Sequence, residues 1–181
     1  MRVAYRQFRP VTLLYARRTG AYETAAREAW GVMEKWLGDN NAGQRAKIRY
    51  GIMHDNPTTT DAELLRYDAC VQALPGFEVD PSAGIRRVTL PGGAYAVHTH
   101  VGSYDQTGEL FTALSKEAVP ERRLALDSER PFIAIYLNDP SITREMHRRT
   151  EICVPVIPLV MPIACNDDID EPLPADALMT G

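Results

Sequence analysis

The chain has 181 residues, of which 45% are hydrophobic and 24% charged, with a formal net charge of −4. That length suits one ordinary domain or two small modules that share a core, and the apolar content excludes a disordered protein. Three cysteines without regular spacing argue against a disulfide framework and favour a reducing, cytoplasmic location. The longest apolar run, residues 154–165, is broken by prolines and is shorter than the about 20 residues that a membrane helix needs. We therefore expect no contact with a membrane.

The negative charge is concentrated at the C-terminal end of the chain. Residues 166–181 hold five acidic side chains and no lysine or arginine, so residues 1–165 carry 20 basic and 19 acidic side chains. Nucleic-acid-binding proteins normally present a distinct basic excess on one face. We therefore expect no direct contact with nucleic acid, and we interpret residues 158–181 as a proline-containing acidic tail.

The first half of the chain predicts a strand, a helix and two further strands. Residues 3–17 are rich in valine, tyrosine and threonine, as strands are. Residues 26–38 carry apolar side chains every three or four positions and end on a glycine, which predicts a helix. Residues 49–54 and 66–72 follow as strands on either side of an Asn-Pro turn. A linker with two prolines and two glycines then covers residues 74–84.

The second half repeats this order of elements. Residues 87–101 have strand composition, and residues 110–118 carry the apolar stripe of a helix that we expect Pro120 to stop. Residues 132–138 and 150–156 predict two closing strands. The loop between them contains an Asp-Pro turn, as its counterpart in the first half contains Asn-Pro.

The two halves are also similar in sequence. At an offset of 83 residues, GIMHDNPTTTDAELLRYDACV (from residue 51) aligns without gaps with AIYLNDPSITREMHRRTEICV (from residue 134), giving six identities in 21 positions. We infer one module used twice, in about residues 1–73 and 85–157, because a single module would leave an apolar face uncovered. The predicted fold is α+β: tandem duplicated strand–helix–strand–strand modules form one mainly antiparallel sheet. Both helices then lie on one face, and a pseudo-two-fold groove between them would suit a small-molecule pocket.

Four segments resemble a known family: RYGIMHDNP, LRYDACV, GGAYAVHTHVGSYDQ and the late pair IYLNDP and RTEICVPV. In their order and spacing they are similar to the GyrI-like family, the effector-binding domain attached to AraC-type and MerR-type transcription regulators. The resemblance covers about residues 1–157, which we expect to form one domain. It implies the duplicated fold described above and a groove for lipophilic, often cationic, small molecules. No helix-turn-helix segment precedes these motifs, so we expect a stand-alone member without a DNA-reading part.

The chain departs from the family pattern at one groove position. Many members carry a glutamate in the segment that ends in Tyr-Leu-Asn-Asp-Pro, and the resemblance implies that this glutamate meets a cationic ligand. Here Ala134 occupies that position, which makes the groove more apolar and weakens the case for a cation. Glu151 is the nearest acidic residue of similar origin, and its position on the strand decides whether it can substitute for the glutamate.

Strand alternation selects the candidate ligand-binding residues. If the groove face of the family is retained, Ala134 and Tyr136 point into the groove, together with their repeat partners Gly51 and Met53. Aromatic side chains from the two helices reach the same groove. The interpretation of each one as an ordinary core residue stays open, since buried aromatic residues usually belong to the core. The predicted ligand-binding set is Tyr136, Ala134, Met53, Gly51, Trp30, Phe111 and Glu151.

Histidines and cysteines are the other residue types with chemical potential. His98 and His100 lie two apart on a predicted strand and would share a face, but no third metal ligand is evident nearby. We expect rings that bond to the backbone, and no metal or other cofactor. Cys70 and Cys153 occupy equivalent positions of the repeat, which indicates packing in the core.

These observations predict a protein that binds a hydrophobic small molecule in the groove between its modules, for sequestration or sensing. Two alternatives stay open, although we expect a binding protein rather than an enzyme. Some GyrI-like proteins hydrolyse reactive natural products, and here Glu151 and Tyr136 would be the catalytic pair. The family name also implies a module that inhibits gyrase through a protein partner.

Overall fold

The computed structural model describes residues 1–73, 75–76, 79 and 81–159. Its helices are α1 (Tyr22–Asp39), α2 (Thr107–Ala113) and α3 (Val119–Glu121), with a π-helical turn at Leu114–Ala118 between the last two. Its strands are β1 (Ala4–Phe8), β2 (Val11–Thr19), β3 (Arg49–Met53), β4 (Arg66–Gln72), β5 (Arg86–Leu90), β6 (Gly93–Val101), β7 (Leu124–Leu126), β8 (Phe132–Tyr136) and β9 (Arg149–Pro158). The predicted helix–strand order is confirmed in both halves, except that the second half has an additional short strand, β7, before its two closing strands. Most of the predicted acidic tail lies outside the described residues.

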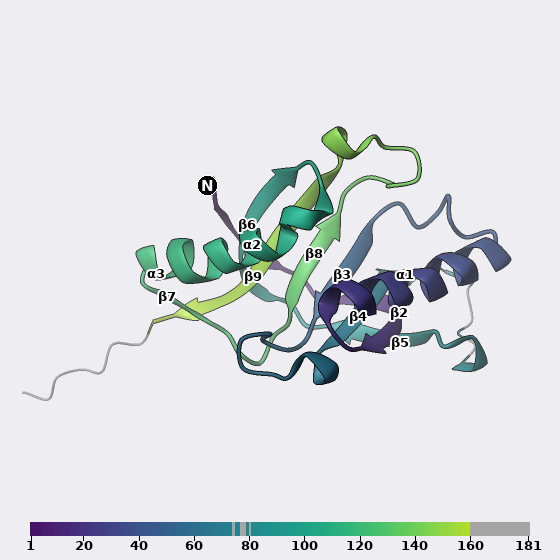
Figure 1. Cartoon of the computed structure of the whole chain (residues 1–181), viewed down its shortest axis with the longest axis horizontal. Coiled ribbons are helices and arrows are strands. Elements are labelled where there is room, and N and C mark those ends of the chain that lie inside the picture. Colours follow the sequence, from purple (N-terminus) through teal and green to yellow (C-terminus); the bar gives the residue numbers. More distant parts are fainter. Residues whose placement is uncertain (74, 77–78, 80, 160–181) are drawn as a thin grey trace, which may run out of the picture.

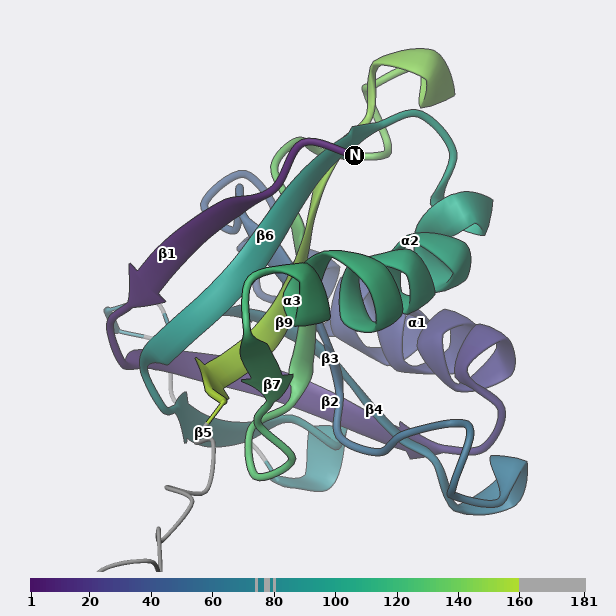
Figure 2. The same ribbon diagram turned by 90° about the vertical axis from the view of Figure 1, so that its left-hand side faces the viewer.

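The strands form one sheet of nine strands, in the order β1-β6-β9-β8-β3-β4-β2-β5, with β7 added beside β9. Every pairing between neighbours is antiparallel. Figure 1 shows β2, β3 and β4 of the first half on one side of the β3–β8 pair and β6, β8 and β9 of the second half on the other. Seen from the side in Figure 2, α1 and α2 lie on the same face of the sheet. The predicted α+β class, the antiparallel sheet and the one-sided helices are confirmed.

The two halves meet at the β3–β8 pair in the middle of the sheet. Gly51 lies directly opposite Ala134. Ala134 is also the repeat counterpart of Gly51, because the repeat offset of 83 residues separates the two positions. A residue pairs with its own repeat equivalent only on a two-fold axis, so the pseudo-two-fold axis of the molecule passes between these two residues. Residues on either side of them on the same face, including Met53 and Tyr136, are therefore related by this axis.

The long strands predicted for residues 3–17 and 87–101 are each broken into two. Pro10 separates β1 from β2, and Pro91 with Gly92 separates β5 from β6, because proline cannot donate a ladder hydrogen bond. The outer pieces then cross to the other half: β1 pairs with β6, and β5 pairs with β2. Each half therefore provides the edge strand for the other half's part of the sheet. The composition of a single strand could not indicate this exchange.

Each helix covers one half of the sheet. Helix α1 packs on β2 and β4 through the buried residues Ala25, Ala29, Met33, Trp36 and Leu37. The second helical stretch packs on the strands of its own half through Phe111, Leu114 and Val119, and it ends at Glu121 rather than at Pro120 as predicted. No helix among the residues described has the length and apolar character needed to cross a bilayer.

The opposite face of the sheet has its own apolar cluster, which includes Cys70 and Cys153. Both cysteines are free and fully buried, as the repeat predicted. The rings of His98 and His100 bond to the backbone carbonyl oxygens of Arg2 and Ser103, at 2.9 Å each. In the described part of the chain, no three potential metal-binding side chains come together.

One carboxylate is buried on this second face. Asp68 is 1% exposed and accepts hydrogen bonds from the Arg17 guanidinium at 2.6 and 2.8 Å, while His54 Nε2 lies 2.7 Å from Oδ2. Burial by itself raises the pKa of a carboxyl group, but the hydrogen bonds from Arg17 and His54 outweigh it and hold the pKa of Asp68 below its usual value. This cluster ties β2, β4 and the end of β3 together.

Replacing Asp68 with asparagine should lower the free energy of unfolding near neutral pH by about 2 kcal/mol, the size of a charge-assisted hydrogen bond. Because the folded-state pKa is depressed, the carboxylate stabilises the fold above the unfolded-state value of about 3.9. That contribution is lost as the pH falls through the folded-state pKa. Urea denaturation from about pH 7 to about pH 3 should therefore show a weaker acid dependence for Asp68→Asn than for the wild type.

The matched control is Asp39→Asn, which removes an exposed carboxylate that pairs with Lys35 on α1. Its stability should change by no more than about 0.5 kcal/mol, because exposed ion pairs contribute little. Equal pH profiles for Asp68→Asn and wild type would contradict the assignment of acid sensitivity to this cluster.

Candidate functional site

A cavity of about 1020 Å³ lies on the helical face of the sheet. It sits over the central β3–β8 pair, where α1 and α2 flank the pseudo-two-fold axis. The cavity is at the upper end of the 300–1,000 Å³ that small-molecule sites usually occupy. Its lining residues are Tyr22, Glu23, Ala26, Arg27, Trp30, Glu34, Arg49, Met53, Tyr67, Tyr104, Asp105, Thr107, Gly108, Phe111, Tyr136, Asp139, Pro140 and Ser141. We call this cavity the groove.

The centre of the groove is a chain of three polar aromatic groups. Trp30 on α1 donates its indole N–H to the Tyr67 hydroxyl at 3.1 Å, and the hydroxyls of Tyr67 and Tyr136 lie 3.3 Å apart. These groups stand directly above Gly51, whose missing side chain leaves room for them. A Cβ at that position would overlap the Tyr67 hydroxyl and come within 3.0 Å of the Tyr136 hydroxyl.

Aromatic rings surround this centre and hold one another in place. The Tyr136 ring makes edge contacts with Trp30 and Tyr104, at centroid distances of 5.8 and 5.1 Å. Tyr22 meets Tyr67 edge-on at 6.3 Å. Edge contacts of this kind fix ring orientation as well as adding contact energy. The rings of the aromatic surface are therefore oriented by one another.

Burial keeps the central tyrosines neutral. Desolvation raises the pKa of Tyr67 well above 10 and also raises the pKa of Tyr136, so both phenols stay protonated at physiological pH. A neutral phenol donates or accepts a hydrogen bond but is a weak base and nucleophile. The centre of the groove is therefore suited to binding and orienting a molecule by contact and hydrogen bonding.

A buried arginine closes one end of the groove. The side chain of Arg49 is 5% exposed, and its Nε donates to Glu34 Oε1 at 3.0 Å. Its Nη1 lies 3.4 Å from Asp139 Oδ2. Burial opposes ionisation of Asp139, but hydrogen bonds from Ser141 and the Arg49 charge hold its pKa below the usual value. Both carboxylates at this end are thus already paired with the same guanidinium.

The floor of the groove at the opposite end is apolar. Phe132 is the repeat counterpart of Arg49, and it stacks on Phe111 with ring centroids 5.6 Å apart. Met53, directly opposite Phe132 in the β3–β8 pair, packs in the same cluster. The pseudo-two-fold axis thus relates a charged end to an apolar end, and the groove presents a different surface at each end to a bound molecule.

The structure brings most of the sequence-predicted site residues together. Trp30, Met53, Phe111 and Tyr136 line the groove. Ala134 is buried in the same sheet face at the axis, opposite Gly51, and belongs to the floor beneath the lining side chains.

Glu151 is the exception, and its predicted place in the groove is wrong. It pairs with Ile135 in the ladder and so points to the other face of the sheet, where it forms an ion pair with Arg6 at 2.7 Å. Side chains along β9 alternate between the two faces of the sheet. The even-numbered residues, such as Thr150 and Ile152, face the groove, so the odd-numbered Glu151 faces the other side. Glu151 and Tyr136 therefore lie on opposite faces, and the structure does not bring together the pair nominated for hydrolysis.

Several groove residues were missed at the sequence level. Tyr67 lies opposite Met53 in the β3–β4 pair, and Arg49 is two residues before Gly51, so the same alternation that selected Met53 and Gly51 would have found both. Tyr104 begins a one-turn 3-10 helix and Asp139 lies in a loop, and both are too short for a periodic pattern, so only the folded chain places these residues beside the groove.

The fold and the groove together define a duplicated α+β domain with a large cavity on the helical face of its sheet. The chain belongs to the family described as the GyrI-like small molecule binding domain, whose model matches residues 1–157. Among curated proteins, it is 29% identical over 139 residues to the DNA gyrase inhibitor of Erwinia billingiae (strain Eb661), covering 76% of this chain and 85% of that one. It is 27% identical over 107 residues to "Probable transcriptional regulator YgiV" of Escherichia coli (strain K12), covering 59% of this chain and 66% of that one.

Solved structures show the same fold. The EcmrR C-terminal domain superposes with a TM-score of 0.67 at 12% identity, covering 87% of this chain and 98% of that one. EcmrR in its complex with DNA gives a TM-score of 0.67 at 14% identity, and the match spans 57% of that longer chain and 87% of this one. SAV2435 bound to tetraphenylphosphonium gives a TM-score of 0.55 at 15% identity, covering 87% of this chain and 94% of that one.

The tight fit above Gly51 makes a specific prediction. Gly51→Ala should lower the free energy of unfolding by about 1–3 kcal/mol, the cost of overpacking a close-packed site, because the new methyl group displaces the Tyr67 hydroxyl. Removing that hydroxyl with Tyr67→Phe should restore part of the loss, so the two changes are coupled by at least about 0.5 kcal/mol. Urea denaturation of the wild type, both single variants and the double variant measures this coupling. Additive effects would show that the glycine does not accommodate Tyr67.

Proposed function

We propose that this chain binds a flat, hydrophobic aromatic molecule in the groove, for sequestration or sensing. The observation that carries the proposal is the gathering of six aromatic side chains around one cavity: Tyr22, Trp30, Tyr67, Tyr104, Phe111 and Tyr136. Such rings offer large contact areas with little conformational freedom to lose. Support also comes from the family, whose description is a small-molecule-binding domain, and from SAV2435, a protein of the same fold that binds tetraphenylphosphonium.

Burial of apolar surface supplies the affinity. At about 25 cal/mol per Å², about 200 Å² of apolar ligand surface contributes about 5 kcal/mol before the costs of association. The edge contacts among Trp30, Tyr104 and Tyr136 hold the receptor surface in place beforehand, which lowers the ordering cost on binding. Hydrogen bonds from the Tyr67 and Tyr136 hydroxyls would then orient a polar substituent of the ligand.

The charge distribution favours a neutral ligand over a cation. Ala134 leaves the floor of the groove without a carboxylate, and the two carboxylates at the closed end share the Arg49 guanidinium. A cation gains most from a buried carboxylate that lacks a partner. Glu34 and Asp139 already have one, and the other two lining carboxylates, Glu23 and Asp105, are exposed to solvent. Shape and aromatic contact rather than charge should therefore select the ligand.

Binding is testable through Trp30, which is one of only two tryptophans. In a Trp36→Phe background, a flat aromatic dye should quench the remaining Trp30 fluorescence saturably, and Tyr136→Ala should weaken binding at least about tenfold, or about 1.4 kcal/mol. The matched control is Tyr15→Ala, a tyrosine on the other face of the sheet, which should leave affinity unchanged. Equal affinities for Tyr136→Ala and Tyr15→Ala would contradict the groove as the binding site.

Arg49 provides a separate test of charge selection. Arg49→Met keeps the length of the side chain but leaves Glu34 and Asp139 without their shared guanidinium, so the groove gains an uncompensated negative charge. The affinity for a cationic dye should rise about fivefold or more relative to a neutral dye of the same shape, and the gain should shrink at high salt. An unchanged cation-to-neutral ratio would contradict the role assigned to Arg49.

A further inference from the structure

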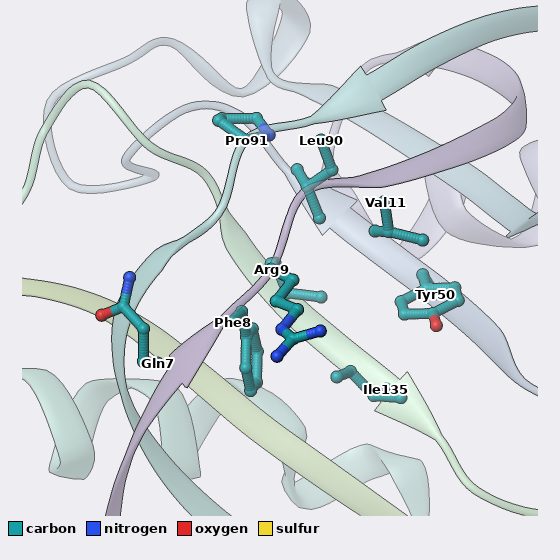
Figure 3. A pocket seen from close by; sticks show the side chains of 9 residues that line it. Gln7, Phe8, Arg9, Val11, Tyr50, Leu90, Pro91 and Ile135 are labelled. Carbon is teal, nitrogen blue, oxygen red and sulfur yellow. The ribbon is translucent and has the colours of Figure 1, made fainter.

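A second cavity, of about 250 Å³, lies on the face of the sheet opposite the groove. Its floor consists of Tyr50 on β3 with Ile133 and Ile135 on β8, which alternate with the groove residues of the same strands. The two strand crossovers form its walls. They contribute Gln7, Phe8, Arg9, Val11, Leu90 and Pro91. Figure 3 shows these side chains around the cavity, which we call the rear pocket.

The walls of the rear pocket are held in position by specific contacts. The Phe8 ring stacks on Tyr95 with centroids 4.9 Å apart and planes inclined by 20°. Gly92 brings the two crossovers together, since a Cβ at that position would lie 2.5 Å from the Phe8 carbonyl oxygen and 3.0 Å from Pro10. The walls of the pocket are therefore built by the strand exchange and fixed by contacts within the chain.

Two polar groups at the rear pocket have unused hydrogen-bonding capacity. Arg9 is exposed at the corner after β1, and within the described residues it makes no ion pair. The Tyr50 hydroxyl likewise has no hydrogen-bond partner in that part of the chain. Desolvation raises the pKa of Tyr50, so this phenol stays protonated and can donate.

The charges near the pocket leave a positive excess. Arg6 and Glu151 neutralise each other through their ion pair at 2.7 Å, and Glu151 borders the pocket as the ladder neighbour of Ile135. Arg9 is then the cation without a counter-charge. An apolar cavity with an uncompensated guanidinium and a phenol donor matches an amphipathic anion, because a carboxylate accepts hydrogen bonds from both groups.

We propose that the rear pocket is a second ligand site, which takes a monocyclic aromatic carboxylate. The aromatic ring lies between Phe8 and the isoleucines of the floor, and the carboxylate meets Arg9 and Tyr50. The volume supports a single ring, because 250 Å³ is below the about 300–1,000 Å³ of sites for larger ligands. The site lies on the other face from the groove and does not depend on the function proposed for the groove.

Benzoate is the probe, titrated into the full chain with isoleucine methyl groups observed by NMR. Saturable shifts should concentrate on Ile133 and Ile135, with the Met53 methyl in the groove unaffected. Benzamide, of the same shape but neutral, should bind about fivefold more weakly, since it lacks the charge that Arg9 recognises. Shifts centred on Met53, or equal affinities for benzoate and benzamide, would overturn the proposal.

Three variants separate this site from a general charge effect. Arg9→Gln should weaken benzoate binding about fivefold and leave benzamide binding unchanged, whereas Arg122→Gln, at an exposed arginine after α3, should change neither. Tyr50→Phe should weaken benzoate binding while keeping the apolar floor. Equal losses in Arg9→Gln and Arg122→Gln would overturn the proposal. It would equally be overturned if sedimentation showed a dimer in which these residues are covered by a second copy.

Discussion

The antiparallel pairing of β3 with β8 is the contact on which the rest of the structure depends. It joins two half-sheets into one, and by placing Gly51 opposite Ala134 it sets the axis that relates them. With the register fixed there, the helices of both halves fall on one face and leave the groove between them. A shift of this pair by one residue would turn every side chain of one half to the other face.

The duplication gives a backbone with pseudo-two-fold symmetry, but the side chains at equivalent positions differ. Tyr67 and its repeat counterpart Thr150 occupy equivalent places, but only the tyrosine reaches across the axis to contact Tyr136. Arg49 and its counterpart Phe132 likewise give one charged and one apolar end. A symmetric site would bind an asymmetric molecule equally well in two orientations. The differences between the halves would therefore give the ligand proposed for the groove a single preferred orientation.

The sequence predicted the fold better than the site, for a physical reason. The repeat and its period-two alternation report local geometry, so they identified the strands, the face of Tyr136 and Met53, and the buried cysteines. They could not report the crossing of β1 and β5 to the opposite half, because that pairing depends on where the chain travels after Pro10 and Pro91. Glu151 was placed wrongly because it was chosen for its carboxylate group. Its position in the alternation of β9 directs the side chain to the other face of the sheet.

Alternation along the central strands also explains how one sheet has a cavity on each face. On β3, Gly51 and Met53 face the groove. Tyr50, the residue before Gly51, faces the other side and belongs to the floor of the rear pocket. The two cavities thus share a backbone but no side chain, because consecutive residues of a strand point in opposite directions. The groove is closed by helices and the rear pocket by crossing strands. The strand exchange that completes the sheet edges is therefore also what gives the second face its concave surface.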